Sequence, residues 1–146
     1  MKPRSCWPVL AKKALEGVEL AQSKVSLARS KLEQLESSRQ KIIEMLEEYK
    51  AQSSSIQVRL HSMTETSGYR HFITQLQTLL KQADFQVAQA HADLGHAQNA
   101  LMQAELKKMK MDALVEQDLA AVRTWERKME QKQMDALGVT LYNLKA

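Results

Sequence analysis

The histidines and the single cysteine are the side chains most able to bind a metal or act as nucleophiles, and their spacing argues against such a site. His91 and His96 lie five residues apart, which puts them on different faces of a helix. No Cys or carboxylate completes a tetrahedral ligand set with them. The chain also lacks a glycine-rich loop of the kind that cradles phosphate. We therefore expect no catalytic residue, no metal and no cofactor, and we expect that the protein is not an enzyme.

Apolar residues recur in alternating steps of four and three along two stretches, residues 14–63 and residues 69–129. The polar exceptions are Arg39, Ser53, Lys108 and Asp118. A repeat of 3.5 residues sustained over this length specifies a left-handed coiled coil, because each helix then shows one narrow seam to its partner. Such a structure has almost no interior in which a catalytic pocket could form. We therefore expect its function to lie on its outer faces and ends.

The composition also favours long helices over a globular domain. The chain has four Gly and two Pro in 146 residues, and both prolines precede the apolar series. Its surplus of Ala, Gln, Leu, Lys, Glu and Met is typical of helices. A short connector makes two long helices antiparallel neighbours. The predicted fold is therefore all-α, a long antiparallel two-helix coiled-coil hairpin.

The interruption of the apolar series places the turn of the hairpin. Hydroxyl side chains in Thr64-Glu65-Thr66-Ser67 can cap a new helix, and Gly68 supplies backbone freedom. Gly138 is interpreted as a C-terminal helix stop. We thus predict a single hairpin over residues 9–137, made of a helix at 9–62, a turn at 63–68 and a helix at 69–137. A flexible lead-in at 1–8 precedes it, and a frayed tail at 138–146 follows it.

The position of the turn also sets the register between the helices. A turn centred near residue 66 would place Leu35 opposite Ala97 and Arg39 near Asp93 and Leu94. An ion pair between Arg39 and Asp93 would then join the helices. A polar residue within the seam commonly fixes register at some cost in stability, and we interpret Arg39 in this way.

The formal net charge of +4 is modest, and the basic clusters at residues 2–13, 107–110 and 127–128 are sparse. Nucleic-acid binding would need a denser basic stripe or a recognisable module, so we expect no nucleic-acid partner. The single Cys6 excludes an internal disulfide and fits a reducing compartment. No uncharged apolar run approaches the roughly twenty residues that span a bilayer. We expect a cytoplasmic protein with no transmembrane segment.

Two places depart from the regular seam. Beside the predicted turn, apolar residues lie off the seam: Ile43, Met45, Phe72, Leu79 and Phe85, next to Tyr49, Tyr69 and Leu76. An apolar strip of this kind indicates a protein partner, with burial by self-association as the alternative. Near the other end, alternating charges in residues 123–132 surround Trp125, which suits an interface at the open end of the hairpin.

Two short segments resemble one known family. Residues 69–76, Tyr-Arg-His-Phe-Ile-Thr-Gln-Leu, resemble the Tyr-x-x-Phe-Ile-x-x-Leu stretch of the flagellar export protein FliJ. Residues 127–135, Arg-Lys-Met-Glu-Gln-Lys-Gln-Met-Asp, resemble the C-terminal Glu-Gln-Lys-x-x-Asp signature of the same family. The length of the chain and the predicted turn also fit, so the resemblance covers nearly the whole chain.

The resemblance implies a cytoplasmic component of the bacterial flagellar type III protein export apparatus, similar in fold to the γ-subunit stalk of the F-type ATP synthase. Such a stalk enters the central hole of the hexameric export ATPase, and family members also bind the export-gate membrane protein and export chaperones. Carried over by position, the gate-binding surface is Ile42, Met45, Tyr49, Phe72, Leu76 and Leu79. The ATPase-facing end is Trp125, Arg127, Glu130, Gln131, Lys132 and Asp135, of which Trp125 is taken from the charged segment described above.

The resemblance thus implies a non-catalytic stalk that couples the export ATPase to the export gate and the chaperones, and we expect the hairpin to be monomeric. It would associate peripherally with the inner face of the cell membrane at the flagellar base. The alternative is a structural coiled-coil scaffold, or the equivalent stalk of a virulence type III secretion system. A stable higher-order bundle would favour the scaffold, because its apolar strip would then be buried by self-association.

Overall fold

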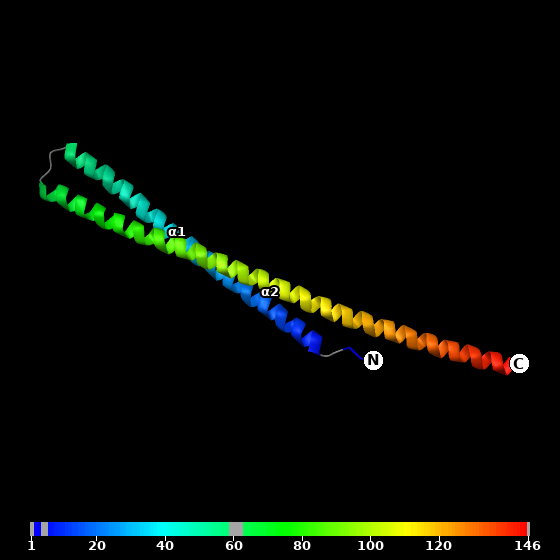
Figure 1. The fold of residues 1–146 in the computed structure, drawn as a ribbon. Helices are drawn as coiled ribbons and strands as arrows, with labels where there is room; N and C mark the ends of the chain where they lie inside the picture. The colour runs from blue at the N-terminus through cyan, green and yellow to red at the C-terminus, as the bar shows by residue number, and fades with distance from the viewer. Residues whose placement is uncertain (1, 4–5, 59–62, 146) are drawn as a thin grey trace. The chain divides into compact units, whose positions relative to one another are not determined.

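The computed structural model describes residues 2–3, 6–58 and 63–145 of the chain, without the side chains of 56–58 and 63–66. The described residues form two helices, α1 (Cys6–Val58) and α2 (Met63–Lys145), and no strand. Residues late in α1 pack against residues early in α2, so the two helices are antiparallel (Figure 1). This confirms the predicted all-α two-helix coiled-coil hairpin.

The packing divides the chain into two units, which are described separately. The turn unit comprises residues 21–100 and therefore contains the later part of α1 and the earlier part of α2. The terminal unit comprises residues 1–20 and 101–146, so that the beginning of α1 lies with the later part of α2.

The predicted apolar seam forms the core of the turn unit. Its most buried apolar side chains are Ala21, Val25, Leu32, Leu46, Leu76, Ala83 and Ala90. The other described seam positions of this unit are half-buried, except that Ser53 is buried as well. The seam positions predicted at Ile56, Leu60 and Met63 lie outside the described side chains. Burial restricted to one row on each helix is what a 3.5-residue repeat produces.

In the terminal unit the seam begins earlier on α1 than predicted and ends earlier on α2 than predicted. Ala14, Val18 and Val122 are buried, and Trp7 and Ala11 continue the series as half-buried residues. Trp125 and Met129 were predicted to lie in the seam, but both are exposed. α1 begins at Cys6, and no side chain from Arg123 to Lys145 is buried. The end of α2 therefore lacks a covering helix.

Both outer ends predicted for the hairpin were wrong. α1 begins at Cys6 instead of residue 9, since Pro8 falls in the first helical turn, where no intrahelical partner for its missing N–H is needed. α2 continues through Gly138 to Lys145, although a frayed tail was predicted at 138–146. A glycine within a helix costs only about 1 kcal/mol. The surrounding Ala and Leu residues favour the helix, and the Thr140 hydroxyl donates a 2.9 Å hydrogen bond to the Ala136 carbonyl.

The predicted turn at 63–68 was also wrong, because α2 already begins at Met63. Gly68 lies within α2 and does not adopt a left-handed backbone conformation. Residues 59–62, where the first helix was predicted to end, lie outside the described residues. The hydroxyl-rich segment before Gly68 therefore belongs to the helix, although its composition is typical of a cap or turn.

The earlier start of α2 shifts the register between the helices. Arg39 Nε donates to Asp84 Oδ1, which corrects the predicted pairing with Asp93. A second contact joins His91 Nε2 to Glu36 Oε1 at 3.2 Å. An interhelical ion pair at Arg39 was predicted, but the partner of Arg39 lies nine positions earlier on α2 than the predicted Asp93. The Arg39 and Asp84 side chains are 42% and 50% exposed, so their pair contributes little to stability and serves mainly to favour this register.

The helical conformation of Gly68 can be tested by substitution. A Cβ at Gly68 would have no heavy atom within 4 Å, so Gly68→Ala should raise the free energy of unfolding by about 0.5–1 kcal/mol through helix propensity. Urea denaturation followed by circular dichroism measures this change. Gly17→Ala is the matched control, because Gly17 lies inside α1 with equally open space. A loss of stability confined to Gly68→Ala would contradict the helical assignment.

Candidate partner-binding surfaces

The six residues predicted to bind the export gate lie together in the turn unit, but they differ in exposure. Met45 and Leu79 are 41% and 48% exposed, whereas Ile42, Tyr49 and Phe72 are half-buried. Leu76 is 3% exposed and belongs to the core. We call the other five residues the turn-side surface. Leu76 is too deeply buried to offer its side chain to a partner, so its role is to hold the two helices beneath that surface.

An aromatic cluster joins Tyr49 and Phe72 of this surface to Tyr69, which lies beside them. Tyr49 on α1 lies between Tyr69 and Phe72 on α2, with ring centroids 5.9 Å and 4.5 Å away. The rings are tilted by 50° and 46°, an arrangement that aromatic quadrupoles favour. Because Tyr69 and Phe72 are three residues apart, one helix face presents both rings to Tyr49.

The cluster lines an open, apolar depression of about 290 Å³, together with Gly68. Gly68 adds no side chain to the wall of this depression. Tyr49, Tyr69 and Phe72 were predicted to lie in one apolar strip, whereas Gly68 was assigned to the turn. The signal that could have added Gly68 to this site is the Gly-Tyr-x-x-Phe spacing opposite Tyr49, once the register is known.

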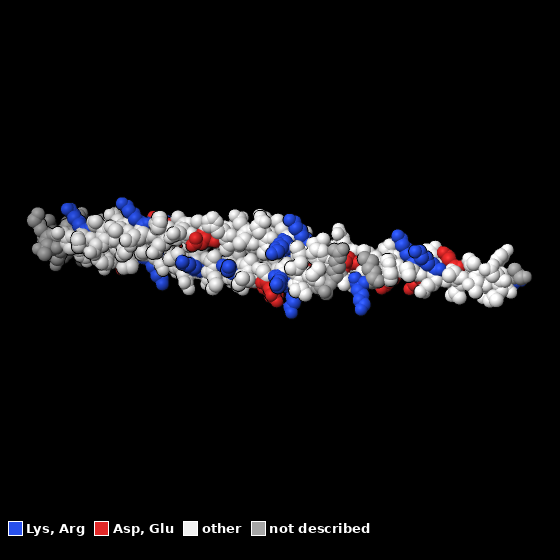
Figure 2. Space-filling view, turned by 60° about the horizontal axis from the view of Figure 1, so that its bottom comes forward, with Lys and Arg blue, Asp and Glu red and all other residues white. Residues whose placement is uncertain are grey.

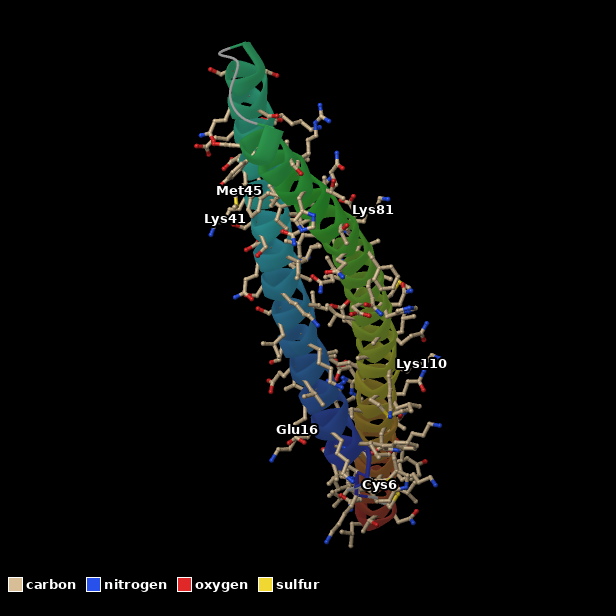
Figure 3. All side chains as sticks on the ribbon, turned by 90° about the vertical axis from the view of Figure 1, so that its left-hand side faces the viewer. Cys6, Glu16, Lys41, Met45, Lys81 and Lys110 are labelled. Atoms are coloured by element: carbon tan, nitrogen blue, oxygen red, sulfur yellow. The ribbon has the colours of Figure 1, made fainter. Side chains whose placement is uncertain are left out.

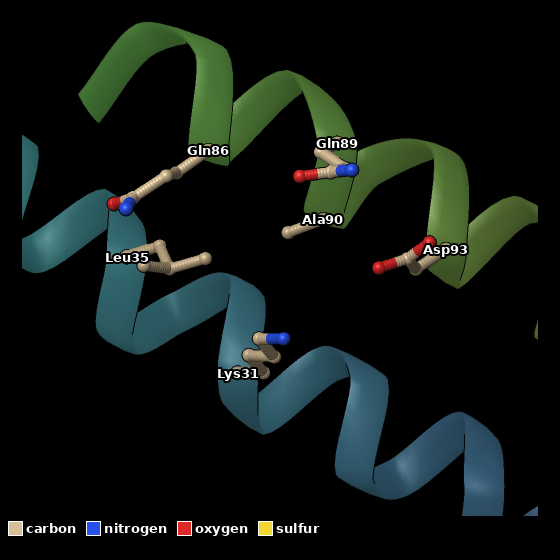
Figure 4. A pocket seen from close by; sticks show the side chains of 6 residues that line it. All are labelled: Lys31, Leu35, Gln86, Gln89, Ala90 and Asp93. Atoms are coloured by element: carbon tan, nitrogen blue, oxygen red, sulfur yellow. The ribbon is translucent and has the colours of Figure 1, made fainter. Parts of the chain in front are cut away.

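A second hollow of about 200 Å³ lies between the helices of the turn unit, lined by Lys31, Leu35, Gln86, Gln89, Ala90 and Asp93 (Figure 4). Leu35 and Ala90 point toward each other in it, which corrects the predicted contact of Leu35 with Ala97. The small side chain of Ala90 leaves the space unfilled. Lys31 and Asp93 supply one charge of each sign, and no Ser, Thr, Cys or His side chain lines the hollow. It is therefore a gap in the packing of the seam.

The predicted ATPase-facing residues all lie on the part of α2 that α1 does not cover. Each of the six is exposed, including Trp125 at 41%. With 3.6 residues per turn, Trp125 and Lys132 share one side of the helix, while Arg127 and Glu130 lie on the opposite side. A partner that contacts the whole set must therefore surround α2, which a flat surface cannot do.

The charges are mixed along the chain. On the face shown in Figure 2, basic and acidic side chains are interspersed without a continuous stripe of either sign. Within the basic cluster at residues 107–110, Lys108 is half-buried in the seam and donates to Asp112 Oδ2 at 2.8 Å. The cluster therefore presents less free positive charge than its sequence suggests.

The described residues were also compared with what a metal site and a membrane-spanning helix require. No group of three or more His, Cys, Asp or Glu side chains within residues 2–3, 6–58 and 63–145 could hold a metal ion. His91 contacts Glu36, and His71 contacts Gln75 at 3.3 Å. Cys6 is an exposed free thiol. Neither described helix is apolar enough over a sufficient length to cross a membrane.

The comparison with protein families identifies the chain. A family model described as the flagellar FliJ protein matches residues 9–146. The chain belongs to the FliJ family. Membership makes it a component of the flagellar export apparatus and confirms the resemblance inferred from residues 69–76 and 127–135. No curated protein and no solved structure matches the chain.

The difference between Leu76 and Leu79 gives a direct test of the turn-side surface. Leu76→Ala should lower the free energy of unfolding by about 2–3 kcal/mol, because it empties a buried seam position. Leu79→Ala should change it by less than about 0.5 kcal/mol, because nearly half of that side chain is already exposed. Chemical denaturation of the two variants measures both values. Equal losses would mean that Leu79 is a core residue and not part of the surface.

Proposed function

We propose that this chain is a non-catalytic stalk that engages the hexameric flagellar export ATPase and couples it to the export gate and to export chaperones. The single observation that carries the proposal is the uncovered end of α2, from Arg123 to Lys145, within a chain of the FliJ family. A helix that exposes functional side chains on opposite sides fits a ring-shaped partner. The hexameric ATPase with a central hole is such a partner.

The uncovered end combines one aromatic anchor with charges of both signs. Trp125 is the largest side chain there, and Trp and Arg are the residue types that most often dominate binding energy at interfaces. Arg127, Glu130, Lys132 and Asp135 surround α2 and would meet complementary charges on the inner wall of a ring. Mixed charge of this kind favours a particular register and orientation more than it raises affinity.

The turn-side surface supports a second contact, with the cytoplasmic part of the export-gate membrane protein. Met45 and Leu79 offer exposed apolar area, and the half-buried aromatic cluster lines an open depression. Lys41 lies near Met45 on α1 and adds a positive charge at the edge (Figure 3). This surface lies in the turn unit and the ATPase-facing end lies in the terminal unit, so separate parts of the chain would address the two partners.

The same proposal places the protein in the cytoplasm, peripherally associated with the inner face of the membrane at the flagellar base. The family match favours the flagellar system over a virulence secretion system. Binding of export chaperones is part of the proposal and would use exposed helix faces that the ATPase and the gate leave free.

Removing exposed apolar area from the turn-side surface should weaken gate binding. We expect the double variant Met45→Ala with Leu79→Ala to raise the dissociation constant for the cytoplasmic domain of the gate protein more than about tenfold. Isothermal titration calorimetry measures this constant. The control is Leu20→Ala with Leu27→Ala, which removes exposed leucines at 59% and 71% exposure from other places on α1. Unchanged affinity in the test variant would refute the surface assignment.

The ATPase-facing end should stimulate ATP hydrolysis by the purified export ATPase. Trp125→Ala should raise the concentration for half-maximal stimulation roughly 30-fold, since loss of an aromatic anchor costs about 2 kcal/mol or more. Phe85→Ala is the matched control, because Phe85 is a 68% exposed aromatic residue in the turn unit. Failure of the unaltered protein to change the hydrolysis rate would contradict the proposed role of this end.

A further inference from the structure

The side of α2 turned away from α1 carries a second series with 3.5-residue spacing in the terminal unit. We call this series the second seam. It consists of Met102, Leu106, Met109, Ala113, Glu116, Ala120, Arg123, Arg127, Glu130, Met134, Leu137, Leu141 and Leu144. All of these residues are exposed. At 3.6 residues per turn the second seam lies almost opposite the positions that pack on α1, so a helix bound there would not collide with α1.

The second seam has two apolar blocks separated by a charged centre. The apolar blocks are residues 102–113 and residues 134–144, and their large side chains range from 46% exposed at Leu106 to 78% at Leu144. Steps of four and three with apolar residues at both ends are the pattern of a coiled-coil seam. Nothing in the described chain covers this face. The spacing therefore indicates a helical partner that runs along it.

The second seam of one chain is complementary to the second seam of another copy that runs in the opposite direction. If two copies of α2 lie antiparallel around an axis between residues 121 and 122, each position of the second seam from Met102 to Leu141 meets another position of the seam in the second copy. The pairs are Met102 with Leu141, Leu106 with Leu137, Met109 with Met134, Ala113 with Glu130, Glu116 with Arg127, and Ala120 with Arg123. Apolar side chains meet apolar ones, the two alanines meet the long side chains of Glu130 and Arg123, and Glu116 meets the opposite charge of Arg127.

The parallel arrangement lacks this complementarity. In register, it would place Glu116 against Glu116 and Arg127 against Arg127, and like charges at such positions oppose pairing. The flanking positions also favour the antiparallel arrangement. There Asp112 would lie opposite Gln133, and Lys110 opposite Gln131, so no like charges meet. Lys110 projects from the side of α2 that faces away from α1 (Figure 3).

The contacts within one chain leave this face available. Arg123 Nη2 lies 3.8 Å from Glu116 Oε1, and both side chains are well exposed at 60% and 77%. Such a long, exposed ion pair contributes little to stability, so replacing it with contacts across the second seam costs little free energy. The paired stretch from 102 to 141 would be about 60 Å long, which is more than five heptads and long enough for a stable two-stranded seam.

We propose that a second copy of this chain binds the second seam, forming an antiparallel α2–α2 dimer with its two-fold axis near residue 121. Each α1 remains on the outer side of its own α2. The inference rests on the sequence of the seam and its exposure, and it is independent of the proposed function. A dimer of this kind departs from the predicted monomer, for which the alternative was self-association through the apolar strip near the turn.

Charge reversal tests the central pair. In sedimentation equilibrium of the full chain, we expect a reversible dimer. Glu116→Arg alone or Arg127→Glu alone should each raise its dissociation constant more than about tenfold, because each places two like-charged pairs across the axis. The double variant Glu116→Arg with Arg127→Glu should restore dimerisation. Lys128→Glu, next to Arg127 but off the second seam, should leave it unchanged.

Cross-linking tests the orientation. In a Cys6→Ser background, one chain carries Met109→Cys and a second, size-tagged chain carries Met134→Cys. A short bifunctional thiol reagent should link the two different chains and should not link two copies of the same variant. A chain that stays monomeric, a dimer that charge reversal does not affect, or links between identical positions would each overturn the proposal. Binding of this face only to another protein's helix would overturn it as well.

Discussion

The narrow apolar seam between α1 and α2 is the constraint on which the rest of the structure depends. One row of side chains from each helix is buried, and small residues such as Ala14, Ala83 and Ala90 let the helices approach closely. A seam of this width leaves most side chains in water. Recognition must therefore use helix faces and ends, where a shallow aromatic depression and a small gap at Ala90 are two of the places that depart from a smooth surface.

The unequal lengths of the two helices create the second important feature. α1 has 53 residues and α2 has 83, so the seam ends at Val122 while α2 continues. Apolar residues beyond that point remain exposed. In our proposals, Arg127 and Glu130 belong both to the ATPase-facing end and to the second seam. The two uses of this surface would therefore exclude each other, and self-association would hold the protein in a form that cannot enter the ring.

The sequence predicted the seam well because burial in a two-helix structure follows directly from periodicity. Ser53, Lys108 and Asp118 lie at seam positions as expected, and Arg39 makes an interhelical ion pair. The turn was harder, because Gly68 and its hydroxyl neighbours are tolerated within a helix at small cost. Because the turn was placed too late in the chain, the predicted register between the helices was shifted. The predicted partner of Arg39 and the predicted contact of Leu35 were therefore wrong. Placing Gly68 beside Tyr49, Tyr69 and Phe72 needed the correct register as well.

The sequence by itself determined the helical fold, the antiparallel pairing and the family, because these depend on a repeat and on short motifs that are local in the chain. Only the tertiary structure decided which residues face each other and which remain exposed. In the structure Leu76 is buried, although it was predicted to belong to the gate-binding surface. Trp125 and Met129 are exposed, although their positions continue the seam. The physical reason is that a seam position is buried only where the other helix reaches it. That depends on where each helix begins, which local sequence preferences specify only weakly.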